Sequence, residues 1–190
     1  RLPVVHMCDS AGGFLPLQAQ FFADRYGAGR IFRNQSTLSK MGVPQVALVL
    51  GNCTAGGAYI PALSDYSVIV RGTGAIFLGG PPLVKAATGE DVTVDELGGA
   101  DMHTSVSGVA DYPADNELHG IAITREIVAQ WRRQPKAGEP AIDPEPPAYD
   151  PAELYGILPA DGRVQFDMRE VIARIVDGSR FHEYQPGYGT

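Results

Sequence analysis

The chain has 190 residues, of which 44% are hydrophobic and 19% are charged, enough for one well-packed domain or one and a half. Its formal net charge of −7 at pH 7 argues against a general nucleic-acid binder, which would carry a basic face. No apolar run is long enough to cross a bilayer, and no signal peptide is visible. The chain opens on Arg1 and runs at once into apolar residues, so we expect a piece of a longer polypeptide whose targeting segment could not be seen.

The first third of the chain alternates between strand-like and helix-like patterns. Residues 2–8 are a continuous apolar run, which predicts a strand covered on both faces. A glycine-containing turn follows, and Pro16 stands at a plausible first position of a helix. The helical pattern breaks at 27–29 and resumes over 31–41, so we expect two helical segments before the next strand.

Shorter elements follow in the middle of the chain. Residues 45–51 predict a second buried strand, 56–63 a short helix, and 66–71 and 75–80 two further strands. The pair Pro81–Pro82 predicts the start of a helix that runs to 88. Strands that alternate with helices indicate α/β architecture.

The last part of the chain predicts a long helix, a linker and the start of another unit. We expect Asp115 to cap a helix whose apolar positions, Leu118 and Ile127 among them, recur three or four residues apart. Residues 135–151 hold six prolines and no apolar periodicity, which predicts an extended linker at a domain boundary. Beyond it, Asp167 and Glu170 have the spacing of a capping box.

Two stretches, DSAGG at 9–13 and CTAGG at 53–57, share the order of a strand, small residues and a helix. The first N–H groups of a helix lack intrahelical acceptors, and the helix dipole adds partial positive charge there. Two such ends side by side could direct donors at one oxygen that becomes anionic, each worth about 3 kcal/mol of barrier. Close packing of helix on strand also selects small residues, so both explanations stay open at this point.

Few side chains suggest chemistry of their own. Cys8 and Cys53 are too few for a disulfide framework or a cysteine zinc site, and we expect both to be reduced in a cytosol-like compartment. His6 lies inside an apolar strand and is interpreted as a core histidine, and the other histidines have no metal-ligand spacing. Ser10 beside Asp9 lacks the GxSxG context of a nucleophilic serine.

Several long strings together resemble the carboxyltransferase (beta) subunits of biotin-dependent acyl-CoA carboxylases, and within that family the methylcrotonyl-CoA carboxylases. The strings are DSAGGFLPLQ, CTAGGAYIPALSD, IFLGGPPLVKAATGE, LGGADMHTSVSGVAD and IVDGSRFHEYQPGYGT. The resemblance implies a crotonase-like (ClpP/crotonase) β-β-α superhelix fold. It also implies most of an N-terminal carboxyltransferase domain at 1–134, the linker at 135–151 and the beginning of a second such domain at 152–190.

The resemblance also implies an activity. The family transfers CO2 from carboxybiotin to an acyl-CoA thioester: biotin accepts a proton from the α-carbon, and backbone N–H groups stabilise the enolate. Biotin is carried by a biotin carboxylase/biotin carrier partner, so this chain would bind the CoA thioester and hold neither biotin nor a metal. We expect a homo-oligomer, a dimer that builds a hexamer, in the cytoplasm or in the mitochondrial matrix of a eukaryote, without nucleic-acid or membrane partners.

The residues that the resemblance implies for the site are mostly small. The catalytic positions are the N–H groups of Ala11 and Gly56, with Gly57 beside them. Lys85 could contact the CoA or acyl portion or belong to a structural turn, and Phe77 could line an acyl pocket or the core. The full set of expected substrate contacts is Gly12, Ala55, Ala58, Phe77, Gly79, Gly80 and Lys85.

Three other functions fit the sequence less well. A crotonase-like hydratase or isomerase places a glutamate base shortly after the glycine cluster, where this chain has Ala58, Tyr59 and Ile60. A serine peptidase of the same broad fold needs a serine at the helix start, which AGGAY lacks. A non-catalytic assembly subunit is disfavoured by the two intact glycine junctions.

Overall fold

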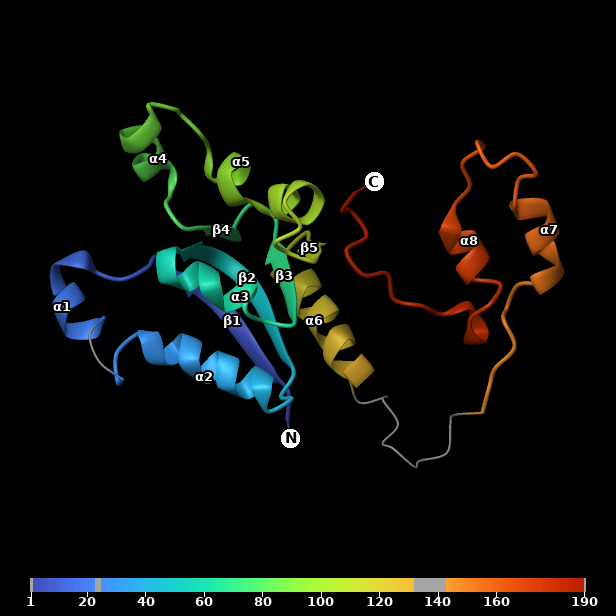
Figure 1. Ribbon diagram of the computed structural model, residues 1–190, viewed down its shortest axis with the longest axis horizontal. Helices are drawn as coiled ribbons and strands as arrows, with labels where there is room; N and C mark the ends of the chain where they lie inside the picture. Colours follow the sequence, from blue (N-terminus) through green and yellow to red (C-terminus); the bar gives the residue numbers. More distant parts are fainter. Residues whose placement is uncertain (1, 23–24, 132–142, 190) are drawn as a thin grey trace. The chain divides into compact units, whose positions relative to one another are not determined.

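The computed structural model describes residues 2–22, 25–131 and 143–189 (Figure 1). The chain divides into two compact units, one comprising residues 1–133 and 184–190 and the other residues 134–183. Part of the predicted linker, residues 135–142, lies outside the described residues. The two units are described separately below.

The first unit is built on one sheet whose paired strands all run parallel (Figure 1). The strands follow the order β1-β2-β3-β5, and β4 pairs with the far part of β2. Every predicted strand is present, and β5 is an addition. The bounds are β1 Val4–Ser10, β2 Gln45–Thr54, β3 Tyr66–Val70, β4 Ala75–Phe77 and β5 Tyr112–Ala114.

The central strand β2 is buried on both faces because helices cover each side of the sheet. Val46 and Leu48 pack in one apolar cluster with Ile127 of helix α6, which spans Glu117–Trp131. Ala47 and Val49 point the other way, into a cluster that includes residues of the short segment after β2. A strand covered on both sides needs a continuous apolar run, which residues 46–50 supply.

The prediction that the first strand is covered on both faces is wrong for this chain. Strand β1 stands at the end of the strand order, and only one of its faces packs against the core. Cys8 is buried on that face, whereas Val5 and Met7 on the other are 44% and 65% exposed. A continuous apolar run therefore identified the strand but not its position at the edge of this sheet.

Helices and turns connect these strands. Two segments follow Ser10: a 3₁₀ turn Leu15–Leu17, which begins around Pro16 as predicted, and the short helix α1 Gln18–Phe21. The remaining helices of the first unit are α2 Gly29–Lys40, α3 Tyr59–Ala62, α4 Pro81–Thr88, α5 Val94–Gly98, a π-helix Met102–Val106 and α6. Helix α5 begins with a Thr93–Glu96 capping box that the sequence analysis did not identify.

Two predicted helix caps are corrected by the structure. Asn116, not Asp115, caps α6: its Oδ1 accepts a hydrogen bond from the N–H of His119 at 2.9 Å, because the helix begins one residue later than predicted. Asp167 does cap helix α8, by accepting from the N–H of Arg169 at 2.9 Å. The reciprocal half of that capping box is missing because Glu170 pairs instead with Arg174.

The second unit is small and mainly helical. A buried guanidinium, that of Arg174, lies 2.8 Å from Glu170 and also pairs with Glu153, so it joins the two helical segments of the unit. Its elements are the 3₁₀ turn Pro151–Glu153, α7 Leu154–Ile157, α8 Met168–Ile172 and the 3₁₀ turn Asp177–Ser179.

Helix α6 allows a direct test of which predicted apolar positions carry stability. Ile127 is 1% exposed in the core, whereas Leu118 is 79% exposed although both fit the same apolar spacing. We expect Ile127→Ala to lower the free energy of unfolding by about 2–5 kcal/mol, and Leu118→Ala to change it by less than about 0.5 kcal/mol. Equilibrium urea denaturation of both variants measures the difference, and equal effects would contradict this packing.

Candidate active site

The two glycine-rich junctions lie side by side at one edge of the sheet. Strand β1 ends at Ser10 and β2 at Thr54, and Ser10 pairs with Cys53 in the parallel register. Because the strands are parallel, the segments that follow both of them leave the sheet on the same edge. The short distance in sequence between each strand end and its glycines brings Ala11 and Gly56 to neighbouring positions.

Each junction contains one residue with a positive φ angle. Gly12 has φ +89° and Ala55 has φ +53°, in the left-handed region. For alanine this conformation costs about 1–2 kcal/mol, so the fold maintains it against a local preference. A left-handed residue next to right-handed ones lets successive N–H groups point into one concave space, an arrangement that suits a negatively charged oxygen.

Gly56 and Gly57 differ in what surrounds them. A Cβ on Gly57 would lie 3.0 Å from both Cβ and Oγ of Ser10, so this glycine permits the close approach of the two junctions. A Cβ on Gly56 would meet only the ring edge of Phe32, at 3.4 Å. The 3₁₀ helix Ala55–Ala58 begins here, and in such a helix an N–H bonds to the carbonyl three residues back. The N–H of Gly56 therefore has no intrahelical acceptor, whereas that of Gly57 can reach the Thr54 carbonyl.

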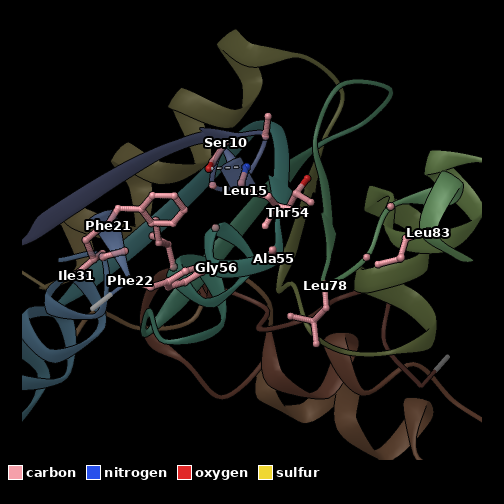
Figure 2. Close-up of a pocket in the computed structure, with 18 of the residues that line it drawn as sticks. Ser10, Leu15, Phe21, Phe22, Ile31, Thr54, Ala55, Gly56, Leu78 and Leu83 are labelled. Atoms are coloured by element: carbon pink, nitrogen blue, oxygen red, sulfur yellow. Dashed lines mark hydrogen bonds between the residues drawn. The ribbon is translucent and has the colours of Figure 1, made fainter. Parts of the chain in front are cut away.

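A cavity of about 620 Å³ opens in front of the two junctions (Figure 2). Seven of the predicted site residues line it: Ala11, Gly12, Ala55, Gly56, Gly57, Gly79 and Gly80. Its other walls are apolar side chains from helices α1, α2 and α4 and the segments beside them. The principal ones are Leu15, Phe21, Phe22, Ile31, Phe32, Leu78 and Leu83.

The cavity contains no titratable side chain among the described residues that line it. Its side-chain hydroxyls are those of Ser10 and Thr54, and Ser10 Oγ accepts a hydrogen bond from the N–H of Gly12 at 3.3 Å. Figure 2 shows this bond at the rim of the first junction. The polar groups available to a ligand here are therefore backbone N–H and C=O groups and two hydroxyls, in apolar surroundings.

Three predicted contacts lie elsewhere. Ala58 and Phe77 line a neighbouring cavity of about 450 Å³, which shares Gly79 with the first. Lys85 lines neither cavity, and its Nζ lies 2.6 Å from Asp91 Oδ1 in an exposed ion pair. The structure thus brings most of the predicted set together and separates these three from it, while the role of each residue stays a prediction.

The aromatic wall was not identified as part of the site from the sequence. Phe21, Phe22 and Phe32 fall within the helical segments predicted before the second strand, and none of them was singled out. Phe32 packs edge-on against Tyr59 with the ring centroids 5.4 Å apart. Apolar residues on a helix give the same periodic signal whether they face a core or a cavity, so the sequence offered no signal that distinguishes the two.

The histidines have structural partners. His103, which lines the second cavity, has Nδ1 2.7 Å from Ser107 Oγ and Nε2 2.7 Å from the Ile76 carbonyl. His6 Nε2 lies 3.2 Å from Gln45 Oε1. Among the described residues, no group of three or more His, Cys, Asp or Glu side chains is placed to hold a metal ion. The same part of the chain contains no helix that is long and apolar enough to cross a membrane.

Comparison with known proteins agrees with this architecture. Residues 1–190 match the family described as carboxyl transferase domain. The mitochondrial methylcrotonoyl-CoA carboxylase beta chain of Arabidopsis thaliana is 53% identical over 196 residues, which cover 100% of this chain and 33% of that protein.

Two crystal structures are similar to the chain. The geranyl-CoA carboxylase beta subunit of P. aeruginosa is 46% identical with a TM-score of 0.61, over 95% of this chain and 33% of that one. Transcarboxylase 12S, solved with methylmalonyl-coenzyme A and methylmalonic acid bound, is 33% identical with a TM-score of 0.84. That match covers 99% of this chain and 35% of the transcarboxylase.

The chain belongs to the carboxyl transferase domain family. Within it, the predicted resemblance to methylcrotonyl-CoA carboxylase beta subunits is confirmed, and so is the crotonase-like α/β fold. The chain spans about a third of the length of the relatives it matches.

The different surroundings of Gly56 and Gly57 predict different responses to the same substitution. We expect Gly57→Ala to lower the free energy of unfolding by about 1–3 kcal/mol, because the added methyl group crowds Ser10. Gly56→Ala faces the cavity and should stay within about 0.5 kcal/mol of the parent protein. Urea denaturation compares the two variants, and a larger loss for Gly56→Ala would show that this glycine is needed for packing.

Proposed function

We propose that the full-length protein is the carboxyltransferase component of a biotin-dependent acyl-CoA carboxylase, and that this chain supplies its acyl-CoA side. The observation that carries the proposal is the cavity itself: two backbone junctions open onto one apolar space whose described lining offers no acid or base. A hydratase would need a carboxylate there, and a peptidase a paired serine. A site without its own base fits a reaction in which the base arrives with the second substrate.

Carboxybiotin, carried by a biotin carboxylase/biotin carrier partner, would supply both the carboxyl group and the proton acceptor. The residues of this chain would hold the thioester. Its carbonyl oxygen would lie between the N–H groups of Ala11 and Gly56 and become anionic as a proton leaves the substrate carbon. Each such donor contributes about 3–4 kcal/mol of transition-state stabilisation.

The apolar wall strengthens this effect and limits the acyl group. A hydrogen bond to an anion is stronger where water is excluded and the local dielectric is low. Phe21, Phe22 and Phe32 give the cavity an apolar surface suited to a short branched acyl group such as methylcrotonyl. The similar geranyl-CoA carboxylase subunit shows that relatives of this chain are named for larger acyl groups as well.

The remaining contacts and partners complete the proposal. Phe77 and Ala58, at the second cavity, and the exposed Lys85 would bind the more distant parts of the CoA thioester. The protein would form dimers that build a hexamer, an assembly named for transcarboxylase 12S. It would act in the cytoplasm, or in the mitochondrial matrix if eukaryotic, as the name of the Arabidopsis relative indicates.

Replacement of Gly56 tests the site in the full-length protein with its partner subunit. We expect Gly56→Val to lower kcat/KM for acyl-CoA carboxylation by about 100-fold or more, because the larger side chain displaces the thioester from the donor. The control is Gly156→Val, since nothing lies within 4 Å of a Cβ placed on Gly156. Radiolabelled bicarbonate incorporation measures activity, and unfolding curves verify that both variants fold. Undiminished carboxylation by a folded Gly56→Val protein would refute this site.

A non-catalytic assembly role is the second candidate, and ligand binding separates it from the first. Isothermal titration of the full-length protein with methylcrotonyl-CoA should give saturable binding that weakens in Gly56→Val and persists in Gly156→Val. A scaffold would show no binding in any of the three proteins.

A further inference from the structure

The two cysteines of the chain lie beside each other under the candidate site. Cys8 is on β1 and Cys53 on β2, both are free thiols, and their side chains are 5% and 0% exposed. They belong to one buried apolar cluster, so both point to the same face of the sheet. The register between the strands is irregular here: Cys8 pairs with Val49, and Ser10 already pairs with Cys53. This irregularity draws Cys53 back toward Cys8.

The thiols interact directly. A hydrogen bond with the Cys53 thiol lowers the pKa of Cys8, and the same contact together with burial raises the pKa of Cys53. Cys8 Sγ also donates to the His6 carbonyl at 3.4 Å. The contact favours a thiolate on one sulfur of the pair, and the thiolate is the form that reacts with an oxidant.

A small oxidant has space to reach the pair. A cavity of about 340 Å³ is lined by both cysteines and by residues on either side of them, including His6, Asp9 and Ser10. Ser10 and Gly57 line this cavity and the acyl cavity alike. The thiols are thus close to the candidate site without being part of its acyl-binding wall.

We propose that Cys8 and Cys53 form a reversible disulfide that inactivates the neighbouring site under oxidising conditions. The oxidant is a peroxide: the Cys8 thiolate attacks one peroxide oxygen and becomes a sulfenic acid as the other oxygen leaves and is protonated to water. The Cys53 sulfur then attacks the Cys8 sulfur, and the sulfenic oxygen leaves as a second water. Two thiols have lost two electrons and two protons, and hydrogen peroxide has been reduced to two waters.

The consequence for activity rests on the proposed function. A disulfide holds its sulfurs about 2.05 Å apart, much closer than two thiols in contact, so the two strand ends must shift toward each other. Cys8 is three residues before Ala11, and Cys53 is three residues before Gly56. A shift of that size passes directly to both donors, and misplacement by about 1 Å costs roughly 100-fold in rate.

The test uses the full-length protein in complex with its partner subunit. Hydrogen peroxide treatment should lower carboxylation at least tenfold, and dithiothreitol should restore it. Peptide mapping by mass spectrometry without reduction should find a peptide pair joined through Cys8 and Cys53. The variants Cys8→Ser and Cys53→Ala should each keep activity under peroxide at doses that inactivate the parent.

Three results would overturn the proposal: no Cys8–Cys53 peptide at inactivating doses, inactivation that dithiothreitol does not reverse, or equal sensitivity of the parent and variants. Peptide mapping needs no variant, so the proposal is tested even if Cys53→Ala does not fold. Peptide mapping detects the cross-link independently of activity. If the Cys8–Cys53 peptide is found but Gly56→Val carboxylates fully, the proposed site is contradicted and the disulfide itself is still supported.

Discussion

The close approach of two strand ends is the constraint on which the rest of the site depends. Ser10 of β1 packs directly against the backbone of Gly57, at a distance where a Cβ would crowd the Ser10 side chain. If the two junctions stood further apart, their N–H groups could not address a single oxygen. The glycine at 57 thus meets a packing requirement, whereas the backbone of Gly56 lines the cavity, where the proposed function places a donor. Of the two explanations that the sequence left open, close packing applies at Gly57, and backbone donation at Gly56 belongs to the proposed function.

A network of buried amides fixes the wall opposite these junctions. Gln35 of α2 donates from Nε2 to the Ile60 carbonyl at 2.8 Å, which ties α2 to α3. The backbone carbonyl of Gln35 accepts a hydrogen bond from Gln45 Nε2 at 3.0 Å, which ties the same helix to β2. Buried polar groups require partners, so these bonds define one position of α2 more sharply than apolar contacts would. Because α2 carries Phe32 to the cavity, these bonds help to fix the position of Phe32 relative to Gly56.

Features of the fold that local sequence patterns determine could be predicted, whereas features that depend on tertiary packing could not. Apolar runs located the strands, and the turn residues located the junctions, because strand burial and backbone reversal leave clear signatures. The exposed face of β1 at Val5 and Met7 could not be predicted, since an edge strand can have the same composition as a central one. The caps were partly misassigned because Asp115 and Asn116 are both good capping residues and only the start of the helix decides between them. The aromatic wall depended on the orientation of α1 and α2, which no local pattern encodes.

The inert side chains of the site now have a physical explanation within the proposed function. Backbone N–H groups do not titrate at physiological pH, and they keep their dipole without a counter-ion, so they can face an apolar cavity at small desolvation cost. A lysine or arginine in the same place would need burial of a full charge, with a penalty of several kcal/mol. It would also bind the ground-state carbonyl and the enolate with less discrimination than fixed dipoles placed for the developing charge. The described lining of the cavity offers no acid or base, so in the proposed function the base would come from another component. In that function the small residues of this chain would serve a reaction that needs a second, mobile partner.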